Sequence, residues 1–143
     1  MAAVVSFVGI SGTGKTTLIE GAVLELKKRG YRVAVIKHAH HGFEMDRPGK
    51  DTWRFAQAGS DIILVSSPDR IAIIERVSEE VWLPQLLKTV SDKVDIVLVE
   101  GYKWASKVKI EVSDKKKTKD ISNTVDFLIE QIKQSQVSNK GKH

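Results

Sequence analysis

The sequence has 143 residues, of which 41% are hydrophobic and 29% charged, a composition typical of a soluble globular chain with a proper core. It contains no cysteine, which excludes disulfides, thiolate metal sites and catalysis by a cysteine nucleophile. The net charge is +5, but much of the excess lies in the lysine-rich residues 115–119 and the tail 140–143, with no aromatic residues between the lysines. We therefore expect solvated segments there and no nucleic-acid-binding surface.

A glycine-rich loop separates the first predicted strand from the first predicted helix. Residues 2–8 (AAVVSFV) are apolar and partly β-branched, as in a buried strand, and residues 17–30 carry apolar side chains at helical spacing. Between them, residues 9–17 (GISGTGKTT) match the pattern Gly-x-x-x-x-Gly-Lys-Ser/Thr. Strand, loop and helix follow in the order in which this motif binds a nucleoside triphosphate.

The chemistry of this loop predicts a role for its residues. Glycines let several backbone N–H groups converge on a phosphate, and the N-terminus of the following helix adds a partial positive charge. Lys15 is predicted to reach the β- and γ-phosphates, and the Thr16 hydroxyl to ligate Mg²⁺. The predicted nucleotide-binding residues of the loop are Gly9, Ser11, Gly12, Thr13, Gly14, Lys15, Thr16 and Thr17. The alternative is a strand-to-helix turn that binds no ligand.

The second predicted strand leads into a polar loop. Residues 31–37 (YRVAVIK) complete a right-handed βαβ unit, which predicts a largely parallel sheet. Residues 38–50 (HAHHGFEMDRPGK) begin at the carboxyl end of that strand, the sheet edge at which ligands bind. Asp46 in this loop is predicted to bind Mg²⁺, directly or through water, or to orient an attacking water. The alternative for Asp46 is a solvated carboxylate.

The histidines of this loop and the helix that follows carry less specific signals. His38, His40 and His41 lack the distant ligands that would complete a zinc site, so we favour a polar loop without a metal role. Residues 51–59 (DTWRFAQAG) are predicted to form a short helix that ends at its glycine. Arg54 on this helix is a candidate for contact with phosphate or with another subunit, and otherwise faces solvent.

Two further strands are predicted to pair with each other. Residues 61–65 (DIILV) and 70–77 (RIAIIERV) are joined by only four residues, too few for a crossover helix. They are therefore predicted to form an antiparallel hairpin, which makes the sheet mixed. Residues 78–91 are predicted to be helical, with Pro84 either in the first turn or at a kink.

Residues 94–100 (VDIVLVE) form an apolar strand that ends in an acidic residue. Downstream of a phosphate-binding loop, this pattern indicates the second NTPase motif and places Glu100 near Mg²⁺. Gly101 follows directly, and Lys103 is predicted to help bind an anionic ligand, the alternative being a solvated lysine. The predicted catalytic residues are Lys15, Asp46 and Glu100, and the predicted metal ligands are Thr16, Asp46 and Glu100.

The remaining sequence completes the expected domain. Residues 107–112 (KVKIEV) alternate as in a half-exposed edge strand, and the next apolar stripe predicts a last helix that docks on the sheet. We expect an α/β, three-layer P-loop NTPase fold over residues 1–134, with a mostly parallel sheet plus an antiparallel hairpin and an edge strand. The polar, basic tail 135–143 is expected to be disordered. With no membrane-length apolar run and no leader pattern, we expect a cytoplasmic protein.

Four segments in order make the chain resemble the molybdopterin-guanine dinucleotide biosynthesis protein B (MobB) family over residues 3 to about 112. They are GISGTGKTTL, VIKHAHHGFEMDRPGKDTWRFAQAGSD, IVLVEGYK and KIEV, and the second discriminates because the first fits many families. The resemblance implies a GTP-binding homodimer with weak, Mg²⁺-dependent GTPase activity. It also implies an accessory role when a partner nucleotidyltransferase attaches GMP to molybdopterin.

The resemblance further implies roles for individual residues. Residues 12–17 would hold the GTP phosphates and Mg²⁺, Glu100 would act as the acidic residue of the second motif, and Asp46 would lie near Mg²⁺ and the γ-phosphate. A polar face around the phosphates, a candidate receiver of molybdopterin or its carrier, would comprise His38, His40, Arg47, Lys50 and Arg54. The guanine reader Asn-Lys-x-Asp is absent, so guanine specificity rests on the resemblance.

Two other functions stay open at this point. A small-molecule P-loop kinase normally closes an arginine-rich lid over the transferred phosphate, and this chain has few arginines and no obvious long lid. The second alternative is a nucleotide-gated adaptor without meaningful catalysis. It differs from the GTP-binding accessory protein only in whether nucleotide turnover matters. For the expected homodimer, the hairpin and the edge strand 107–112 are the candidate pairing surfaces, because unpaired strand edges invite association.

Overall fold

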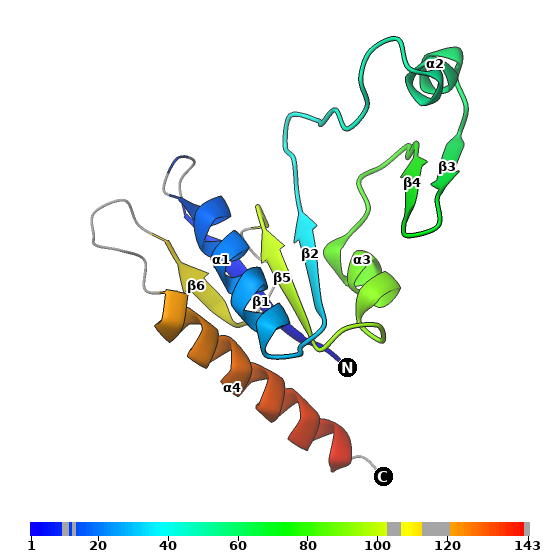
Figure 1. The fold of residues 1–143 in the computed structure, drawn as a ribbon. Helices are drawn as coiled ribbons and strands as arrows, with labels where there is room; N and C mark the ends of the chain where they lie inside the picture. Colours follow the sequence, from blue (N-terminus) through cyan, green and yellow to red (C-terminus); the bar gives the residue numbers. More distant parts are fainter. Residues whose placement is uncertain (10–11, 13, 103–106, 113–120, 142–143) are drawn as a thin grey trace. The chain divides into compact units, whose positions relative to one another are not determined.

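The computed structural model describes residues 1–9, 12, 14–102, 107–112 and 121–141 (Figure 1). The chain divides into two compact units, one formed by Met1–His40 with Trp82–His143 and the other by His41–Val81. The prediction of one domain over residues 1–134 did not anticipate this division. Among the described residues, no helix combines the length and the apolar character needed to cross a membrane.

The first unit is built on a four-stranded parallel sheet. In chain order its strands are β1 (Ala3–Val8), β2 (Val33–Lys37), β5 (Ile96–Glu100) and β6 (Lys109–Glu111). In space the order is β2-β5-β1-β6, so β1 and β5 are central and β6 lies at one edge. The predicted parallel sheet and its edge strand are therefore confirmed, and the four strands have their carboxyl ends on the same side.

Helices cover both faces of this sheet (Figure 1). On one face, α1 (Lys15–Lys28) and α4 (Ile121–Lys140) pack over a core that includes Phe7 and Leu98. On the other face, α3 (Leu83–Val90) packs against Val97 and Val99. Successive side chains of a strand point to opposite faces, which is why neighbouring residues of β5 enter two different cores. The result is the predicted three-layer α/β arrangement.

The end of α1 returns the chain to the sheet. Gly30 adopts a φ of 88°, its N–H donates to the carbonyl oxygen of Lys27 at 3.0 Å, and the Tyr31 N–H donates to that of Leu26 at 3.0 Å. This pair of bonds is a Schellman motif, in which glycine is favoured because the left-handed conformation strains other residues. Tyr31 and Leu26 both pack in the core, so the motif directs the chain into β2.

The second unit contains α2 (Asp51–Ala58), β3 (Ile62–Ser66) and β4 (Ile71–Glu75). The strands pair antiparallel, which confirms the predicted hairpin, and the predicted helix ends at Gly59 as expected. The prediction that the hairpin makes the main sheet mixed is wrong, because β3 and β4 form a separate two-stranded sheet. Strand pairing is a non-local property, and the four-residue connection predicts only that these two strands meet.

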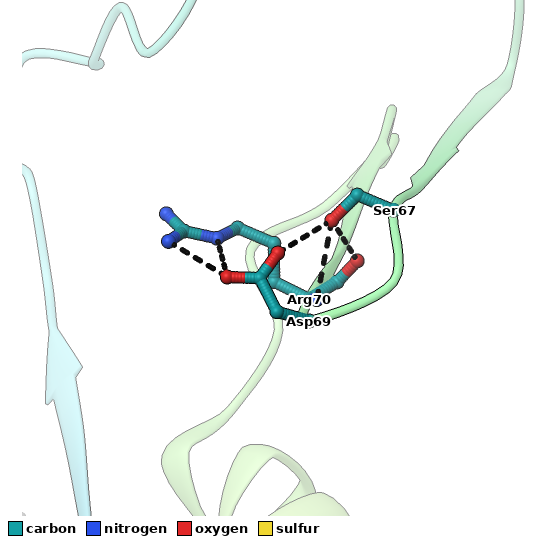
Figure 2. A network of polar contacts seen from close by, with 3 residues as sticks. All are labelled: Ser67, Asp69 and Arg70. Carbon is teal, nitrogen blue, oxygen red and sulfur yellow. Dashed lines mark hydrogen bonds and ion pairs between the residues drawn. The ribbon is translucent and has the colours of Figure 1, made fainter.

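Side chains and backbone groups hold the turn of this hairpin together (Figure 2). The Ser67 hydroxyl donates to Asp69 Oδ1 at 2.9 Å, and Arg70 Nη2 donates to Asp69 Oδ2 at 3.2 Å. The Ser67 N–H donates to the carbonyl oxygen of Arg70 at 2.9 Å. The hydrogen bond from Ser67, followed by that from Arg70, lowers the pKa of the Asp69 carboxyl from its ordinary value, because both donors favour the charged form.

Two helices differ from the sequence prediction. Helix α3 begins at Leu83 instead of residue 78, with Pro84 in its first turn, where the missing N–H of proline costs no helical bond. Helix α4 continues to Lys140, so the expectation of a disordered tail is wrong for residues 135–140. Two side chains in this segment bind the Met1 carbonyl oxygen, Ser135 Oγ at 2.6 Å and Asn139 Nδ2 at 3.4 Å. These long-range bonds help hold a polar segment in the helix, and the sequence alone does not show them.

Candidate functional site

The loop between β1 and α1 lies at the carboxyl edge of the sheet. Gly12 and Gly14 have φ values of 81° and 85°, a left-handed conformation that favours glycine. Gly14 is the N-cap of α1, with no side-chain cap and no acidic residue in the first turn. The first N–H groups of a helix lack partners within the helix, so they are donors for a ligand at this end. Ser11 and Thr13 lie outside the described residues.

The structure brings Lys15 and Glu100 together. Lys15 Nζ lies 3.2 Å from Glu100 Oε1 and donates to the carbonyl oxygen of Gly9 at 2.7 Å. The two side chains are only 14% and 16% exposed. Glu100 is the last residue of β5 and is paired in register with Phe7 of β1, which places its side chain beside the loop that follows β1. Two residues 85 positions apart in sequence (100 − 15) thus meet at one edge of the sheet.

A second lysine, which the sequence analysis did not select, faces the same place. Lys37 ends β2 and is paired in register with Glu100. Since β2, β5 and β1 are neighbours, the ends of these strands place Lys37 in the lining of the same cavity as Lys15. Its position as the last residue of a predicted parallel strand was the available signal, because ligands bind at the carboxyl ends of such strands.

Two adjoining cavities open at this edge of the first unit. The phosphate cavity has a volume of about 400 Å³ and is lined by Gly12, Gly14, Lys15, Thr16, Lys37 and Glu100. The histidine cavity has a volume of about 610 Å³ and is lined by Phe7, Val8, Gly9, Lys15, Lys37, His38, His40, Glu100, Gly101 and Tyr102. Lys15, Lys37 and Glu100 line both, so these three charged residues form a shared wall.

Two histidines and a tyrosine surround the histidine cavity. The His40 Nε2 atom lies 3.0 Å from the carbonyl oxygen of Gly101. Because a carbonyl oxygen only accepts, this nitrogen carries the proton. The ring of His38 lies against those of His40 and Tyr102, with centroids 4.2 Å and 4.8 Å away. In the described part of the chain, no three histidine or acidic side chains are grouped to hold a metal ion by themselves.

Gly101 holds the ends of β2 and β5 close together. A Cβ atom at this position would lie 2.7 Å from the carbonyl oxygen of His38, and the φ of Gly101 is +94°. The His38 N–H donates to the carbonyl oxygen of Glu100 at 2.9 Å across the same junction. Only glycine fits both the backbone conformation and the space, so Gly101 is required for the shape of the cavity.

The other predicted site residues belong to the second unit. Asp46, Arg47 and Lys50 lie in the loop before α2, and Arg54 lies on α2. The Lys50 N–H donates to the carbonyl oxygen of Arg47 at 3.2 Å, which with Gly49 at a φ of 91° forms a tight turn. Arg47 and Lys50 therefore lie in the turn that leads into α2, and Arg54 lies on the helix itself. That Asp46 meets Thr16 and Glu100 stays a prediction, and Lys103 lies outside the described residues.

The chain matches the family model of molybdopterin guanine dinucleotide synthesis protein B over residues 4–133. It is similar to the molybdopterin-guanine dinucleotide biosynthesis adapter protein of Haemophilus influenzae, at 38% identity over 122 residues, which are 85% of this chain and 68% of that protein. The protein of the same name from Escherichia coli is 39% identical over 113 residues, which cover 77% of this chain and 65% of that protein.

Solved structures with the same fold carry related names. The crystal structure of MobB from Bacillus subtilis has a TM-score of 0.72 at 22% identity and covers 90% of this chain and 97% of its own. A crystal structure of molybdopterin-guanine biosynthesis protein B has a TM-score of 0.70 at 25% identity, with coverage of 89% and 98%. These likenesses confirm the fold class predicted from the sequence, an α/β P-loop NTPase fold.

Proposed function

The chain belongs to the molybdopterin guanine dinucleotide synthesis protein B family, and from this premise we propose that it is a GTP-binding adapter in molybdenum cofactor biosynthesis. In this role it assists the attachment of GMP to molybdopterin by a partner nucleotidyltransferase. The adapter role rests on relatives of which this chain covers 68% and 65% of the length. The family membership itself bears out the resemblance drawn from the sequence.

One observation carries the nucleotide part of this proposal, the meeting of Lys15 and Glu100 over a phosphate-sized cavity. Their 3.2 Å ion pair lies in the wall of the phosphate cavity, together with Lys37. Two ammonium groups and the N–H groups at the start of α1 match the charge and the acceptors of a triphosphate. On binding, Lys15 exchanges its carboxylate partner for the β- and γ-phosphates, which leaves Glu100 available for the accompanying cation.

The residues of this cavity fit Mg²⁺. That ion takes oxygen ligands and is bound through one or two carboxylates together with substrate phosphates and water, without a cage made of protein alone. Thr16 and Glu100 both line the phosphate cavity and supply a hydroxyl and a carboxylate. We assign Thr16 and Glu100 to the ion, and a role for Asp46 as a further ligand stays a prediction from the sequence. When bound, Mg²⁺ neutralises charge on the terminal phosphates.

We propose slow hydrolysis of GTP. Among the described residues that line both cavities, Lys15 and Lys37 supply positive charge. We infer the slow rate from the family resemblance, which implies weak, Mg²⁺-dependent GTPase activity. Lys15 stabilises the charge on the phosphates, and the role of Asp46, at Mg²⁺ or at the attacking water, stays a prediction from the sequence.

The hairpin supports the proposal of a homodimer. Ile62, Leu64, Ile71 and Ile73 lie on one face of the two-stranded sheet and are each 56–67% exposed, whereas Ile63 on the opposite face is buried. A contiguous exposed apolar face of this kind is typical of a protein–protein interface. The edge strand β6 is less suitable, because it is only three residues long and carries Lys109 and Glu111, features that prevent edge pairing.

The oligomeric state tests this surface directly. Leu64→Glu places a charge in the exposed face and is expected to give monomer in size-exclusion chromatography with light scattering at micromolar concentration. Leu24→Glu is the matched control, since Leu24 on α1 is 58% exposed and Leu64 is 60% exposed. A parent protein that is already monomeric would contradict the dimer.

Lys15→Ala tests the nucleotide site. Loss of charge-assisted hydrogen bonds to the phosphates is expected to weaken Mg·GTP binding roughly 100-fold, measured by isothermal titration calorimetry. Lys28→Ala is the control, because Lys28 is 64% exposed and pairs with Glu25 on the surface of α1. If Lys15→Ala keeps its fold by circular dichroism and binds GTP as the parent does, the assignment of the loop is wrong.

A further inference from the structure

Lys37 lies across Glu100 from the loop that precedes α1. We propose that Lys37 binds the γ-phosphate of the nucleotide and thereby lets the protein distinguish GTP from GDP. This inference rests on the proposed function, and it gives the recognition of the terminal phosphate to a residue outside the phosphate-binding loop. The juxtaposition that carries it is the placement of Lys37, Glu100 and Lys15 in the wall shared by the two cavities.

The order of the strands determines where Lys37 lies relative to the loop. Glu100 is paired in register with Phe7 of β1 on one side and with Lys37 of β2 on the other. The loop follows Val8 at the end of β1, so the loop and Lys37 lie on opposite sides of Glu100. Neighbouring strands are about 4.8 Å apart, which puts the Lys37 backbone about 10 Å from β1. A lysine in this position approaches the phosphates from the side that the loop does not enclose.

The lining of the two cavities indicates which phosphate Lys37 meets. In this kind of loop the backbone N–H groups cradle the α- and β-phosphates, and the lysine reaches the β- and γ-phosphates. Gly14 and Thr16, at the start of α1, line only the phosphate cavity, whereas Lys15 and Lys37 also line the histidine cavity. The phosphates therefore run from the start of α1 towards the shared wall, and the last of them meets Lys37.

The surroundings of Lys37 leave its charge available to a ligand. Lys37 is exposed, and none of the ion pairs between described side chains involves it. Lys15 instead lies 3.2 Å from Glu100 and donates to the carbonyl oxygen of Gly9. A phosphate that binds Lys15 has to displace a carboxylate, whereas at Lys37 no described carboxylate competes with it. Hydrogen bonds between an ammonium group and a phosphate are charge-assisted and stronger than those between neutral groups.

A contact made only with the γ-phosphate is what separates a triphosphate from a diphosphate. Specificity is a difference between two affinities, so a group that binds both ligands equally does not contribute to it. The loop N–H groups, Lys15 and Mg²⁺ all bind oxygens of the β-phosphate, which GDP retains. Lys37 binds only the group that hydrolysis removes, so its loss is expected to weaken the binding of the triphosphate alone.

Calorimetric titrations of the β,γ-imido analogue of GTP and of GDP, each with Mg²⁺, test this assignment. The parent is expected to bind the analogue more tightly than GDP. Lys37→Met removes the charge and keeps an unbranched side chain, and it is expected to weaken binding of the analogue about tenfold. GDP affinity should stay within about twofold, because Lys37 is exposed and its loss leaves the loop contacts in place. Lys28→Met on α1, where Lys28 is 64% exposed, is the matched control and should change neither affinity.

Phosphorus NMR of the bound analogue identifies the phosphate that Lys37 contacts. Lys37→Met is expected to shift the resonance of the γ-phosphorus and to leave that of the α-phosphorus in place. Lys28→Met should shift neither resonance.

Three results would overturn the inference while leaving the proposed function intact. The first is an equal loss of affinity for the analogue and for GDP in Lys37→Met, which would make Lys37 a general attractor of anions. The second is parent affinity for the analogue in this variant, together with an unshifted γ-phosphorus resonance. The third is equal affinity of the parent for the analogue and for GDP. Failure of the parent to bind either nucleotide would instead overturn the proposed function, and this inference with it.

Discussion

Strand β5 and the β3–β4 hairpin are both apolar in sequence, yet they bury their side chains very differently. Ile96, Val97, Leu98 and Val99 of β5 are completely buried, since helices cover both faces of the sheet. In the hairpin, Ile63 is the one buried strand residue and Ile74 is half-buried, whereas the other strand residues are exposed, Leu64 to 60%. Strand β5 is therefore a buried support that holds Glu100 at its end. The β3–β4 hairpin instead presents an exposed apolar surface suited to a partner.

The largest expected effect on stability comes from the same substitution, leucine to alanine, made once in β5 and once in the hairpin. Leu98→Ala leaves a cavity between α1, α4 and the sheet and is expected to lower the free energy of unfolding by about 2–5 kcal/mol. Leu64→Ala, at an exposed position, should change it by no more than about 0.5 kcal/mol in the monomer. Urea unfolding followed by circular dichroism measures both. Equal losses would contradict the contrast between scaffold and surface.

A pair of glycines sharpens the same contrast at the level of the backbone. Gly101→Ala meets both a φ of +94° and a contact of 2.7 Å with the His38 carbonyl oxygen, so we expect a loss of about 1–3 kcal/mol. Gly42→Ala in the second unit has a similar φ of +85° with nothing within 4 Å, and should cost only the backbone strain of about 1 kcal/mol. If the two variants unfold at the same denaturant concentration, the close packing around Gly101 does not matter.

Two carboxylates, Glu100 and Asp46, are predicted to contribute to GTP hydrolysis. Glu100→Gln and Asp46→Asn are each expected to lower the rate of GTP hydrolysis by about 10- to 100-fold, because both are assigned to Mg²⁺ or its water shell. GTP binding should change much less than hydrolysis, since Lys15 and the loop remain. The control is Asp92→Asn, outside both cavities, measured in the same phosphate-release assay. Parent rates in both variants would remove these roles.

The smallest expected effect concerns the turn of the hairpin. The pKa of Asp69 is lowered, first by the Ser67 hydrogen bond, so the charged form is favoured in the folded state. Its contribution to stability is therefore present above the pKa of the unfolded chain and is lost as the pH falls through the folded value. Titration by NMR should show the Asp69 pKa rising in Ser67→Ala and unchanged in Ser78→Ala. An ordinary Asp69 pKa in the parent would contradict the hydrogen bonds drawn in Figure 2.

The parts predicted well from sequence are those with local patterns. The loop 9–17 and the acidic end of β5 are short motifs, and the rule that parallel strands share one carboxyl edge was enough to expect Lys15 and Glu100 together. The sequence analysis did not select Lys37, because a lysine at the end of a strand cannot be distinguished from an ordinary solvated lysine until the strand order is known. The order β2-β5-β1-β6, which makes Lys37 a neighbour of Glu100, depends on pairings distant in sequence.

Other features depended on contacts that no local pattern shows. The hairpin forms a separate sheet, and the chain divides into two units, because of which surfaces pack together. The composition of residues 41–81 does not indicate either feature. The last turns of α4 are polar, and Ser135 and Asn139 are held by Met1, at the opposite end of the sequence. Helix propensity is a weak guide where tertiary contacts contribute, which explains the wrong prediction for residues 135–140.

The central claim is that the sheet edge of the first unit binds GTP with Mg²⁺. Calorimetric titration of GTP and of ATP into the same protein, each with and without Mg²⁺, tests it most directly. We expect GTP to bind more tightly than ATP and to lose affinity when Mg²⁺ is removed. Equal affinity for the two nucleotides, or a preference for ATP, would contradict the claim and favour a small-molecule kinase.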